Sequence, residues 1–555
     1  MIGVIANPDD RAVVSEFFQL FKTPWEFYQN DGRYEVLLCA TDSRFDESTA
    51  KLVLIYAGHE LPFDAQETMI ATRSSSTRTL LYKGVRVPVY GENVTFRKKG
   101  TDVLVEEQSQ QPAMYQYQSQ GRMVAHIGYD LFSEVRTVLT TGQPAAHAAI
   151  PTLDLHISLL RDLIVASGAS LVEIPPIPEG YKFIACLTHD VDHPSIRRHG
   201  LDHTTLGFLY RATLGSLFDL LRGRISIQSL LANWAAVVEL PFVYMGIAND
   251  FWSDFDDRYL QLEKGLPSTF FVIPFKGRPG KNSHKQAPRF RAACYGAQDI
   301  TDAIRKVMAA GCEVGLHGID AWADPSRGRE EVEEIRRLTG VQEIGVRMHW
   351  LYYDQQSPEA LERAGADYDS TIGYNETVGY RAGTTQVYRP LTATRLLELP
   401  LHVMDTALFY QSYLGLSPKQ ATTLLSRFVD NSTQFGGCLT INWHDRSLAP
   451  ERLWGVIYRD LLQQLKDRGA WFATAGEVNS WFRKRRSAEF EKNCIEPDGV
   501  RAKVKVERNG HLPGLQLRIH NACKPSGAGA QPSNKHVDLA IDENVDKRIP
   551  CSASR

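Results

Sequence analysis

The sequence predicts an α/β protein whose largest part is a parallel sheet or a (β/α) barrel. Short apolar segments that read as buried strands alternate with helical segments between residues 181 and 488, and this alternation is typical of parallel sheets. Asp, His and Arg residues directly follow several of these strands. In barrel enzymes the C-terminal ends of the strands carry the active site, so the same pattern indicates an enzyme.

Length and composition narrow the class of protein. At 555 residues the chain is too long for one ordinary domain. It is 43% apolar and 23% charged with a net charge of −3, which is typical of a soluble globular protein and gives no reason to expect nucleic acid as a partner. The eight cysteines are scattered without a C-x-x-C pair, which favours free thiols in a reducing compartment.

Two features bear on location. The start, MIGVIANPDD, has no basic segment followed by an apolar core, so we expect a cytoplasmic protein. The longest apolar stretch, residues 235–248, contains Glu239 and Pro241 and is too short to span a bilayer. We therefore expect no transmembrane segment.

The first 150 residues read as an accessory α/β domain. Its strand, hairpin and helix signals are residues 35–41, 51–58, 77–91 and 126–142. Residues 151–180 then give an amphipathic helix and a proline-rich linker.

The first strand of the predicted barrel, at residues 181–192, carries the clearest chemical signal. Five apolar residues, Phe183 to Leu187, read as a strand buried on both faces, and the sequence THDVD follows. Asp190 and Asp192 are two residues apart, so an extended chain points them to the same side. Two neighbouring carboxylates suit a divalent cation and a base, although a capped turn would use the same residue types.

A helical insertion is predicted at residues 195–262. His193, His199 and His203 lie near its start, where they either form a second metal centre or face solvent. Its basic and aromatic helix is a candidate contact for an anionic glycan carrier or a membrane surface, which makes peripheral membrane contact a hypothesis.

Later strands repeat the pattern of an apolar run followed by polar residues. The predicted strand segments are residues 266–274, 311–322, 345–354, 366–383, 395–405, 438–446 and 470–476. Those at 311–322, 345–354 and 438–446 end in His317 with Asp320, Arg347 with His349, and His444 with Asp445. Residues 489–555 read as a small β appendage or a partly disordered tail.

The ordered motifs THDVD, LHGxD, VRxH and a late WHD resemble those of the NodB-type polysaccharide deacetylases of carbohydrate esterase family 4. The resemblance covers about residues 180–485. It implies a distorted (β/α) barrel of about seven strands, within the predicted barrel domain at 181–488. It also implies a divalent metal and an Asp/His pair that remove an N-acetyl group from an amino sugar.

The resemblance assigns a role to each matching residue. Asp190 matches the general base and Asp192 a metal ligand. His317 matches the first metal histidine, Arg347 the arginine that holds the base, and His444 the general acid. Pairing with an arginine fixes the orientation of an aspartate base and keeps its carboxylate ionised. A histidine can donate a proton near neutral pH. Asp445, next to His444, is a candidate to orient that ring.

The third metal ligand departs from the family pattern. The family has a second histidine four residues after the first, but the residue four after His317 is Ala321. His349, on the same strand face as Arg347, is our choice, and Asp320 is the competitor. Catalytic zinc commonly has three His or carboxylate ligands and one open position, so we expect Zn²⁺.

Further residues are predicted to bind substrate. Trp322, Trp350 and Trp443 adjoin the motifs, and flat aromatic rings suit sugar faces, although core packing is an equal explanation. Arg381 either binds a phosphate or carboxylate of the substrate or forms an ion pair with Asp367 or Asp369.

The sequence thus predicts a cytoplasmic, metal-dependent deacetylase of an N-acetylated amino sugar in a glycan or glycan precursor, for example in exopolysaccharide biosynthesis. The alternatives are hydrolysis of another non-peptide C–N bond on the same barrel and a non-catalytic glycan-binding protein.

Overall fold

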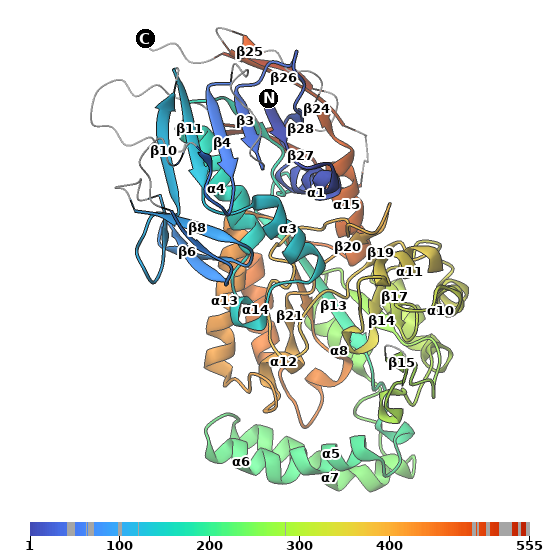
Figure 1. Ribbon diagram of the computed structural model, residues 1–555. Coiled ribbons are helices and arrows are strands. Elements are labelled where there is room, and N and C mark those ends of the chain that lie inside the picture. Colours follow the sequence, from blue (N-terminus) through green and yellow to red (C-terminus); the bar gives the residue numbers. More distant parts are fainter. Residues whose placement is uncertain are drawn as a thin grey trace. The chain divides into compact units, whose positions relative to one another are not determined.

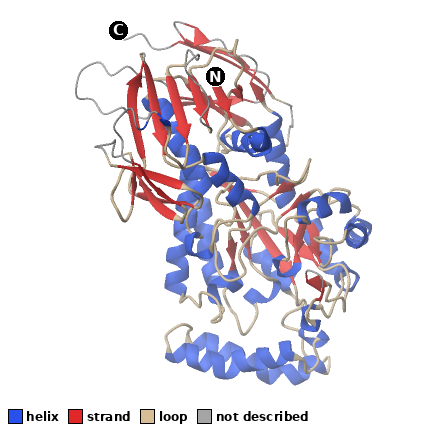
Figure 2. Ribbon diagram, in the orientation of Figure 1, coloured by secondary structure: helices blue, strands red, loops and turns tan. Residues whose placement is uncertain are grey.

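The protein is described from a computed structural model. The structure describes residues 1–40, 50–62, 64, 71–97, 103–119, 121–282, 285–490, 495–496, 499–506, 511–520, 536–541 and 545–550. Helices and strands are distributed throughout these ranges (Figure 2). The chain forms two compact units. The first, residues 1–180, 382–384 and 481–555, is called the N-terminal unit, and the second, residues 181–381 and 385–480, is called the barrel unit.

The N-terminal unit is built on a mostly parallel sheet with strand order β10-β11-β4-β3-β1-β2. The predicted strands at 35–41 and 51–58 are β3 and β4, and the predicted hairpin at 77–91 is the antiparallel pair of β6 and β7. The strands and helices are β1 (Ile2–Ile5), β2 (Trp25–Phe27), β3 (Val36–Cys39), β4 (Leu52–Tyr56), β5 (Ala71–Ser74), β6 (Arg78–Tyr82), β7 (Val85–Val89), β8 (Asn93–Phe96), β9 (Leu104–Glu106), β10 (Met114–Ser119), β11 (Arg122–Ile127), α1 (Arg11–Phe21), α3 (Leu131–Thr140) and α4 (Thr152–Ala166).

The described C-terminal strands are grouped with this same unit. β12 (Leu171–Glu173) lies in the predicted linker and pairs antiparallel with β27 (Leu515–His520), with Leu171 opposite His520. β27 pairs in turn with β28 (His536–Ile541), and β24 (Glu489–Phe490), β25 (Ile495–Glu496) and β29 (Val545–Pro550) pair with β26 (Gly499–Lys505). Residues 521–535 and 551–555 lie outside the described ranges, so a partly disordered tail stays a prediction.

The barrel unit contains a curled sheet of parallel strands flanked by helices (Figure 1). The predicted α/β class with a (β/α) barrel is therefore confirmed. The strand order is β20-β19-β18-β17-β14-β13-β22-β21, and β23 also pairs with β13. The strands are β13 (Phe183–Val191), β14 (Thr269–Val272), β17 (Glu313–Gly318), β18 (Val346–Met348), β19 (Tyr368–Asp369), β20 (Leu397–Glu398), β21 (Val403–Met404), β22 (Cys438–Asn442) and β23 (Ala470–Phe472); the helices include α9 (Thr301–Ala309), α10 (Pro325–Thr339), α11 (Ser357–Ala364), α12 (Asp405–Phe409), α13 (Pro418–Phe435), α14 (Gly455–Asp467) and, where the chain returns to the N-terminal unit, α15 (Ala475–Ser487).

The barrel is distorted at the two edge strands of its sheet. The single strand predicted at 395–405 is two short strands, β20 at one end of the sheet and β21 at the other. Residues 399–402 join them, and Pro400 in this segment has no N–H to donate to a strand ladder. Leu399 N–H donates to Asp369 of β19, whereas His402 N–H donates to Thr440 of β22. The segment therefore crosses from one edge of the sheet to the other.

β13 is the central strand and extends further than its apolar run predicts. All nine of its residues are buried. Thr188 to Val191 pair with Thr269 to Val272 of β14, which keeps the chain extended through Asp190. Asp190 therefore lies within the strand, and Asp192 lies just beyond its end.

The insertion is a pair of helical arms at one end of the barrel unit (Figure 1). α8 (Phe255–Leu262), which the prediction placed in the insertion, packs on the barrel, with Phe255 and Tyr259 in the barrel core. The insertion proper comprises α5 (His203–Tyr210), a π-helical turn (Arg211–Gly215), α6 (Ser216–Leu221) and α7 (Ile227–Tyr244). Its large exposed apolar side chains include Leu206, Tyr210, Leu214, Phe218, Leu221, Ile227, Leu231, Trp234, Val238, Phe242 and Met245. α7 has 18 residues and a mean hydropathy of 1.2, which meets the length and composition of a membrane span, but 28% of it is buried and one such helix is weak evidence.

Candidate functional site

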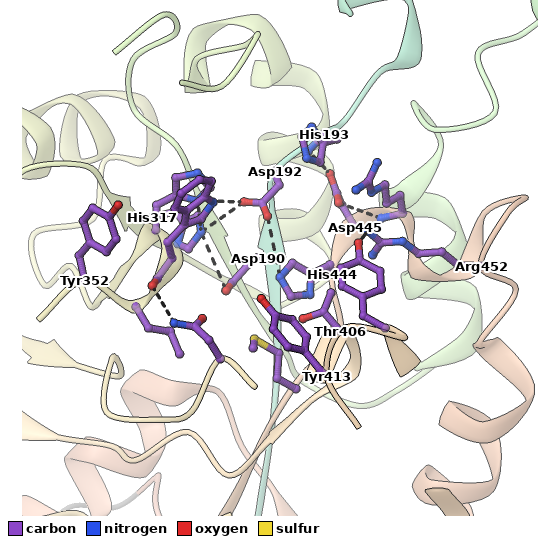
Figure 3. A pocket seen from close by; sticks show the side chains of 17 residues that line it. Asp190, Asp192, His193, His317, Tyr352, Thr406, Tyr413, His444, Asp445 and Arg452 are labelled. Atoms are coloured by element: carbon purple, nitrogen blue, oxygen red, sulfur yellow. Dashed lines mark hydrogen bonds and ion pairs between the residues drawn. The ribbon is translucent and has the colours of Figure 1, made fainter. Parts of the chain in front are cut away.

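A cavity of about 370 Å³ lies at the C-terminal ends of the barrel strands and contains most of the predicted catalytic and metal-binding residues. Figure 3 shows Asp190, Asp192, His317 and His444 projecting into it from several strands. The other lining residues are His193, His349, Trp350, Leu351, Tyr352, Asn375, Met404, Thr406, Tyr410, Tyr413, Asp445, Arg446 and Arg452.

Asp192, His317 and His349, here called the triad, bring three ligand atoms together. Asp192 Oδ1 lies 3.3 Å from His317 Nε2 and 3.3 Å from His349 Nδ1, and the two nitrogens are 3.1 Å apart. Ligands placed tetrahedrally around a zinc ion at 2.0–2.1 Å are about 3.3 Å from one another. The triad therefore has the spacing of a metal site.

Backbone carbonyls fix which ring nitrogens face the centre of the triad. His317 Nδ1 lies 2.9 Å from the carbonyl of Arg347, and His349 Nε2 lies 3.1 Å from the carbonyl of Arg291. A carbonyl only accepts hydrogen bonds, so these nitrogens carry the proton and the facing nitrogens of neutral rings present lone pairs. Asp192 Oδ1 is buried and accepts no hydrogen bond. Three lone-pair donors thus face one another, an arrangement that a cation stabilises.

Electrostatics keep the triad in its ligand form. Burial by itself raises the pKa of Asp192, but His349 and His317 outweigh it and hold that pKa well below its usual range. Burial lowers the pKa of His349, and Asp192 opposes this only in part. An ionised carboxylate beside a neutral imidazole is the form that binds a metal.

Asp320, the competing third ligand, is placed elsewhere. Its Oδ1 accepts a hydrogen bond from the backbone N–H of Lys281 at 2.8 Å, and its Oδ2 accepts one from Arg327 Nη1 at 2.8 Å. Both oxygens therefore have partners outside the triad. The structure brings His349, not Asp320, to His317 and Asp192.

Asp190 is held by two side chains beside the triad. Arg347 Nη1 donates to its Oδ1 at 3.1 Å, and Asn442 Nδ2 donates to its Oδ2 at 2.8 Å. Asn442 Oδ1 also accepts the backbone N–H of Asp190 at 3.1 Å, which fixes the amide orientation. The sequence analysis missed Asn442, although it lies two residues before His444 and so on the same strand face.

Arg347 has the environment expected of a fixed positioning residue. It is fully buried, and its guanidinium also donates to Thr188 Oγ1 at 2.6 Å, to the carbonyl of Ser370 at 2.9 Å and to Ser370 Oγ at 2.8 Å. It lies 4.6 Å from the ring centroid of Phe271. These contacts leave the guanidinium one orientation, which sets the position of the Asp190 carboxylate.

His444 is paired with Asp405, not with the adjacent Asp445 that the sequence suggested. Its Nδ1 lies 2.6 Å from Asp405 Oδ1, and its Nε2 lies 3.8 Å from Asp192 Oδ2. Burial lowers the pKa of His444, but Asp405, Asp192 and Asp190 outweigh burial and raise it to about 10. Asp445 instead accepts the backbone N–H of His193 at 2.7 Å. Asp405 is the last residue of the strand predicted at 395–405, and this position was the available signal for it.

The predicted substrate-binding residues divide into two kinds. Trp350 lines the cavity with φ 63°, a left-handed conformation that is uncommon outside glycine and is often found at functional sites. Trp322 and Trp443 are 3% and 0% exposed and pack in the hydrophobic core, so they cannot stack on a sugar. Arg381 donates to the carbonyl of Gly373 at 2.8 Å and is not a cavity residue. For Trp322 and Trp443 burial assigns a structural role, whereas substrate binding by Arg381 stays a prediction.

The histidines near the insertion are not all solvent-facing. His193 lines the cavity, and its Nδ1 lies 3.2 Å from His199 Nε2, whereas His199 Nδ1 lies 2.8 Å from Asp202 Oδ2. His199 is buried because it packs against Trp252. Of the three, only His203 is exposed.

Comparisons with known proteins give limited information. No family model and no curated protein matches the chain. Matching solved structures include one assigned as a polysaccharide deacetylase from Mycobacterium smegmatis, with 19% identity and a TM-score of 0.35 over 56% of this chain and 95% of that one. Another, similarly assigned, is from Pseudomonas aeruginosa PAO1, with 17% identity and a TM-score of 0.36 over 58% and 98%. Puue allantoinase matches with 16% identity and a TM-score of 0.33 over 55% and 92%. At these values the likeness carries no functional argument.

Proposed function

We propose that the protein is a metal-dependent hydrolase of C–N bonds, of the amide type, that removes the N-acetyl group of an amino sugar in a glycan or glycan precursor. One observation carries the proposal. Three lone-pair donors, Asp192 Oδ1, His317 Nε2 and His349 Nδ1, face one another with no hydrogen atom between them. They line the same cavity as Asp190, which pairs with Arg347, and His444, which pairs with Asp405.

The triad residues would hold the metal, and two histidines with one carboxylate are a ligand set typical of catalytic zinc. When bound, a divalent cation supplies Lewis-acid chemistry, which polarises a carbonyl group and makes water more acidic. No other residue needs to ligate it.

The remaining residues have separate tasks in amide hydrolysis. Asp190, oriented by Arg347 and Asn442, accepts the proton of the attacking water. His444, kept protonated by Asp405, donates a proton to the departing amine. An amine leaves readily only when it is protonated, and the raised pKa of His444, about 10, keeps the ring in the protonated form that can donate.

The substrate part of the proposal rests on the motif resemblance and on the cavity. An N-acetylated sugar fits a cavity that Trp350, Tyr410 and Tyr413 line, because aromatic rings pack well on sugar faces. A cytoplasmic location and a role in exopolysaccharide or other glycan assembly are part of the proposal and follow from the sequence alone.

The test measures acetate release and metal content together. Purified protein would be assayed against N-acetylated sugars and oligosaccharides, with and without a chelator, and then after zinc is added back. We expect release that chelation stops and zinc restores, and we expect Asp190→Asn to lower it by roughly 10²–10⁴-fold while retaining metal. Bound metal with release of ammonia or another acid from a non-sugar amide would indicate a different C–N hydrolase. Absence of both metal and hydrolysis would favour a non-catalytic glycan-binding protein.

A further inference from the structure

One end of the cavity holds a concentration of arginine that the proposed reaction does not use. Arg446 and Arg452 both line the cavity and are 7% and 6% exposed. In Figure 3, Arg452 lies on the opposite side of His444 from His317. The arginine end therefore adjoins the catalytic groups within a single cavity.

The positive charge at this end is incompletely neutralised. Arg211, Arg446 and Arg452 share the carboxylate of Glu451, at 2.6, 3.8 and 3.5 Å. Its closest partner is Arg211, which is not a cavity residue. The other nearby acids have their own contacts: Asp405 pairs with His444, and the Asp445 oxygens accept the backbone N–H groups of His193 and Arg446.

Several guanidinium nitrogens also lack hydrogen bonds. Arg446 Nε is buried without a hydrogen-bond partner among the described residues, and Arg446 Nη1 and Arg452 Nε lie 3.8 and 3.5 Å from Glu451 Oε1 without a hydrogen bond to it. Buried donors of this kind are rare and costly in free energy, so they need an explanation. Arg452 Nη1 donates to Ser447 Oγ at 3.1 Å, and its Nη2 donates to the Tyr410 hydroxyl.

Aromatic packing holds both guanidinium groups in place. Arg446 lies 5.0 Å from the ring centroid of Trp252, and Arg452 lies 5.0 Å from that of Trp454. The arginines also lower the pKa of Tyr410, although burial by itself would raise it. Together these contacts make a fixed, positively charged wall. Planar arginine donors fit phosphate oxygens in pairs, and a prepositioned wall binds them with little loss of side-chain entropy.

We infer that Arg446 and Arg452 form an anion subsite for a phosphate ester on the amino-sugar substrate. This inference rests on the proposed function and narrows it: the substrate is a phosphorylated N-acetyl sugar. The phosphate belongs either to a soluble donor, such as a sugar phosphate or a nucleoside diphosphate sugar, or to an isoprenyl-linked sugar. The cavity volume of about 370 Å³ lies within the usual range for small-molecule sites, about 300–1,000 Å³.

The experiment compares phosphorylated and unphosphorylated probes on the full chain. N-acetylglucosamine, its 1-phosphate, its uridine diphosphate form and a short isoprenyl diphosphate ester would be titrated calorimetrically and assayed for acetate release. We expect the phosphorylated probes to bind more tightly. In Arg446→Gln, the preference for phosphorylated over unphosphorylated probe should fall on the order of 10- to 100-fold. The phosphorylated probe with the highest kcat/KM identifies the source of the phosphate.

Arg211→Gln is the matched control, because it removes an arginine from the same carboxylate at a position outside the cavity. It should lower the preference less than Arg446→Gln does, because it removes no cavity donor and only leaves Glu451 freer to neutralise the other two arginines. Arg446→Lys keeps the charge without the planar donors, so an intermediate preference supports the subsite, and thermal melting identifies any variant that has not folded.

The outcomes separate this inference from the proposed function. Arginine-dependent binding of the phosphorylated probes without acetate release would contradict the deacetylase function and support the anion subsite. Equal affinity and equal acetate release for phosphorylated and unphosphorylated probes would overturn the subsite and leave the deacetylase function intact.

Discussion

Two groups of His and acidic side chains in the barrel unit differ in a useful way. The triad consists of Asp192, His317 and His349, and the second group, here called the outer group, consists of His199, Asp202 and Cys294. In each group the ligand atoms lie within 4.8 Å of one another. Proximity alone therefore does not distinguish a metal site from a set of hydrogen bonds.

The hydrogen bonds make the distinction. In the outer group, His199 Nδ1 donates to Asp202 Oδ2 at 2.8 Å, and Asp202 Oδ1 accepts the N–H groups of Thr204 and Thr205 at the start of α5. Each donor has an acceptor, and burial raises the pKa of the Cys294 thiol, which disfavours the thiolate that would bind a metal. In the triad, the ring nitrogens that face away from its centre donate to backbone carbonyls. The three atoms that face the centre have no hydrogen-bond partners among the described residues except one another.

The largest expected effect is on metal content. His317→Ala should lower the affinity for zinc by more than about 100-fold, since removing a ligand costs more than the 10- to 100-fold loss typical of its hydrogen-bond partners. His199→Ala, the matched change in the outer group, should leave one zinc per chain by elemental analysis. If only the His199 variant lost its metal, the metal site would lie in the outer group and not in the triad.

The third ligand can be assigned in the same way. His349→Ala should lose zinc nearly as completely as His317→Ala, whereas Asp320→Ala should retain it, because both Asp320 oxygens are bonded to Lys281 and Arg327. Metal content of the two variants, measured after dialysis, distinguishes them. Retention in His349→Ala together with loss in Asp320→Ala would place the third ligand at Asp320.

A smaller effect is expected on pH dependence. Asp405 and the neighbouring carboxylates raise the pKa of His444 to about 10, so the ring stays protonated up to that pH. Asp405→Asn removes one carboxylate, lowers this pKa and should move the alkaline decline of kcat toward neutral pH, with a loss of roughly 10-fold or more at pH 8.5. An unchanged alkaline limb in the pH profile would show that His444 is not the acid.

The smallest effect concerns stability near the outer group. Burial lowers the pKa of His193 and His199 below that of an unfolded histidine, about 6.5. Below that pH the unfolded chain binds more protons than the folded one, so stability should fall as the pH falls. Amide protection factors over residues 196–252, which are corrected for the base-catalysed intrinsic rate, should be lower at pH 5.5 than at 7.5, and His203→Gln, at an exposed position, should not alter this difference.

The sequence predicted most of the site because strand alternation places chemical residues on one face. Asp190 with Asp192, and Arg347 with His349, follow this rule, and the structure brings all four into or beside the cavity. The α/β class followed from the same strand and helix periodicity. These features depend on local pattern, which a single sequence displays directly.

The misses depend on long-range geometry. Asp405 directly follows β21 and Asn442 ends β22. Their positions at strand ends were visible in the sequence, but their pairing with His444 and Asp190 depends on the order of the strands in the sheet. Trp322 lies in a turn after β17 and Trp443 directly follows β22, and both are buried in the hydrophobic core although they adjoin the motifs. Residues 395–405 divide into β20 and β21 because the chain crosses from one edge of the sheet to the other through the segment that contains Pro400.

The position of β13 has a consequence for how the chain folds during synthesis. β13 pairs with β22, with Ile184 opposite Cys438, and with β23, with Phe183 opposite Ala470. Its partners on that side emerge from the ribosome more than 200 residues later, and pairings this distant in sequence form slowly. A nascent chain of some 400 residues therefore carries an apolar strand with one open edge, which favours aggregation unless a chaperone covers it. We expect truncation before residue 438 to give insoluble protein.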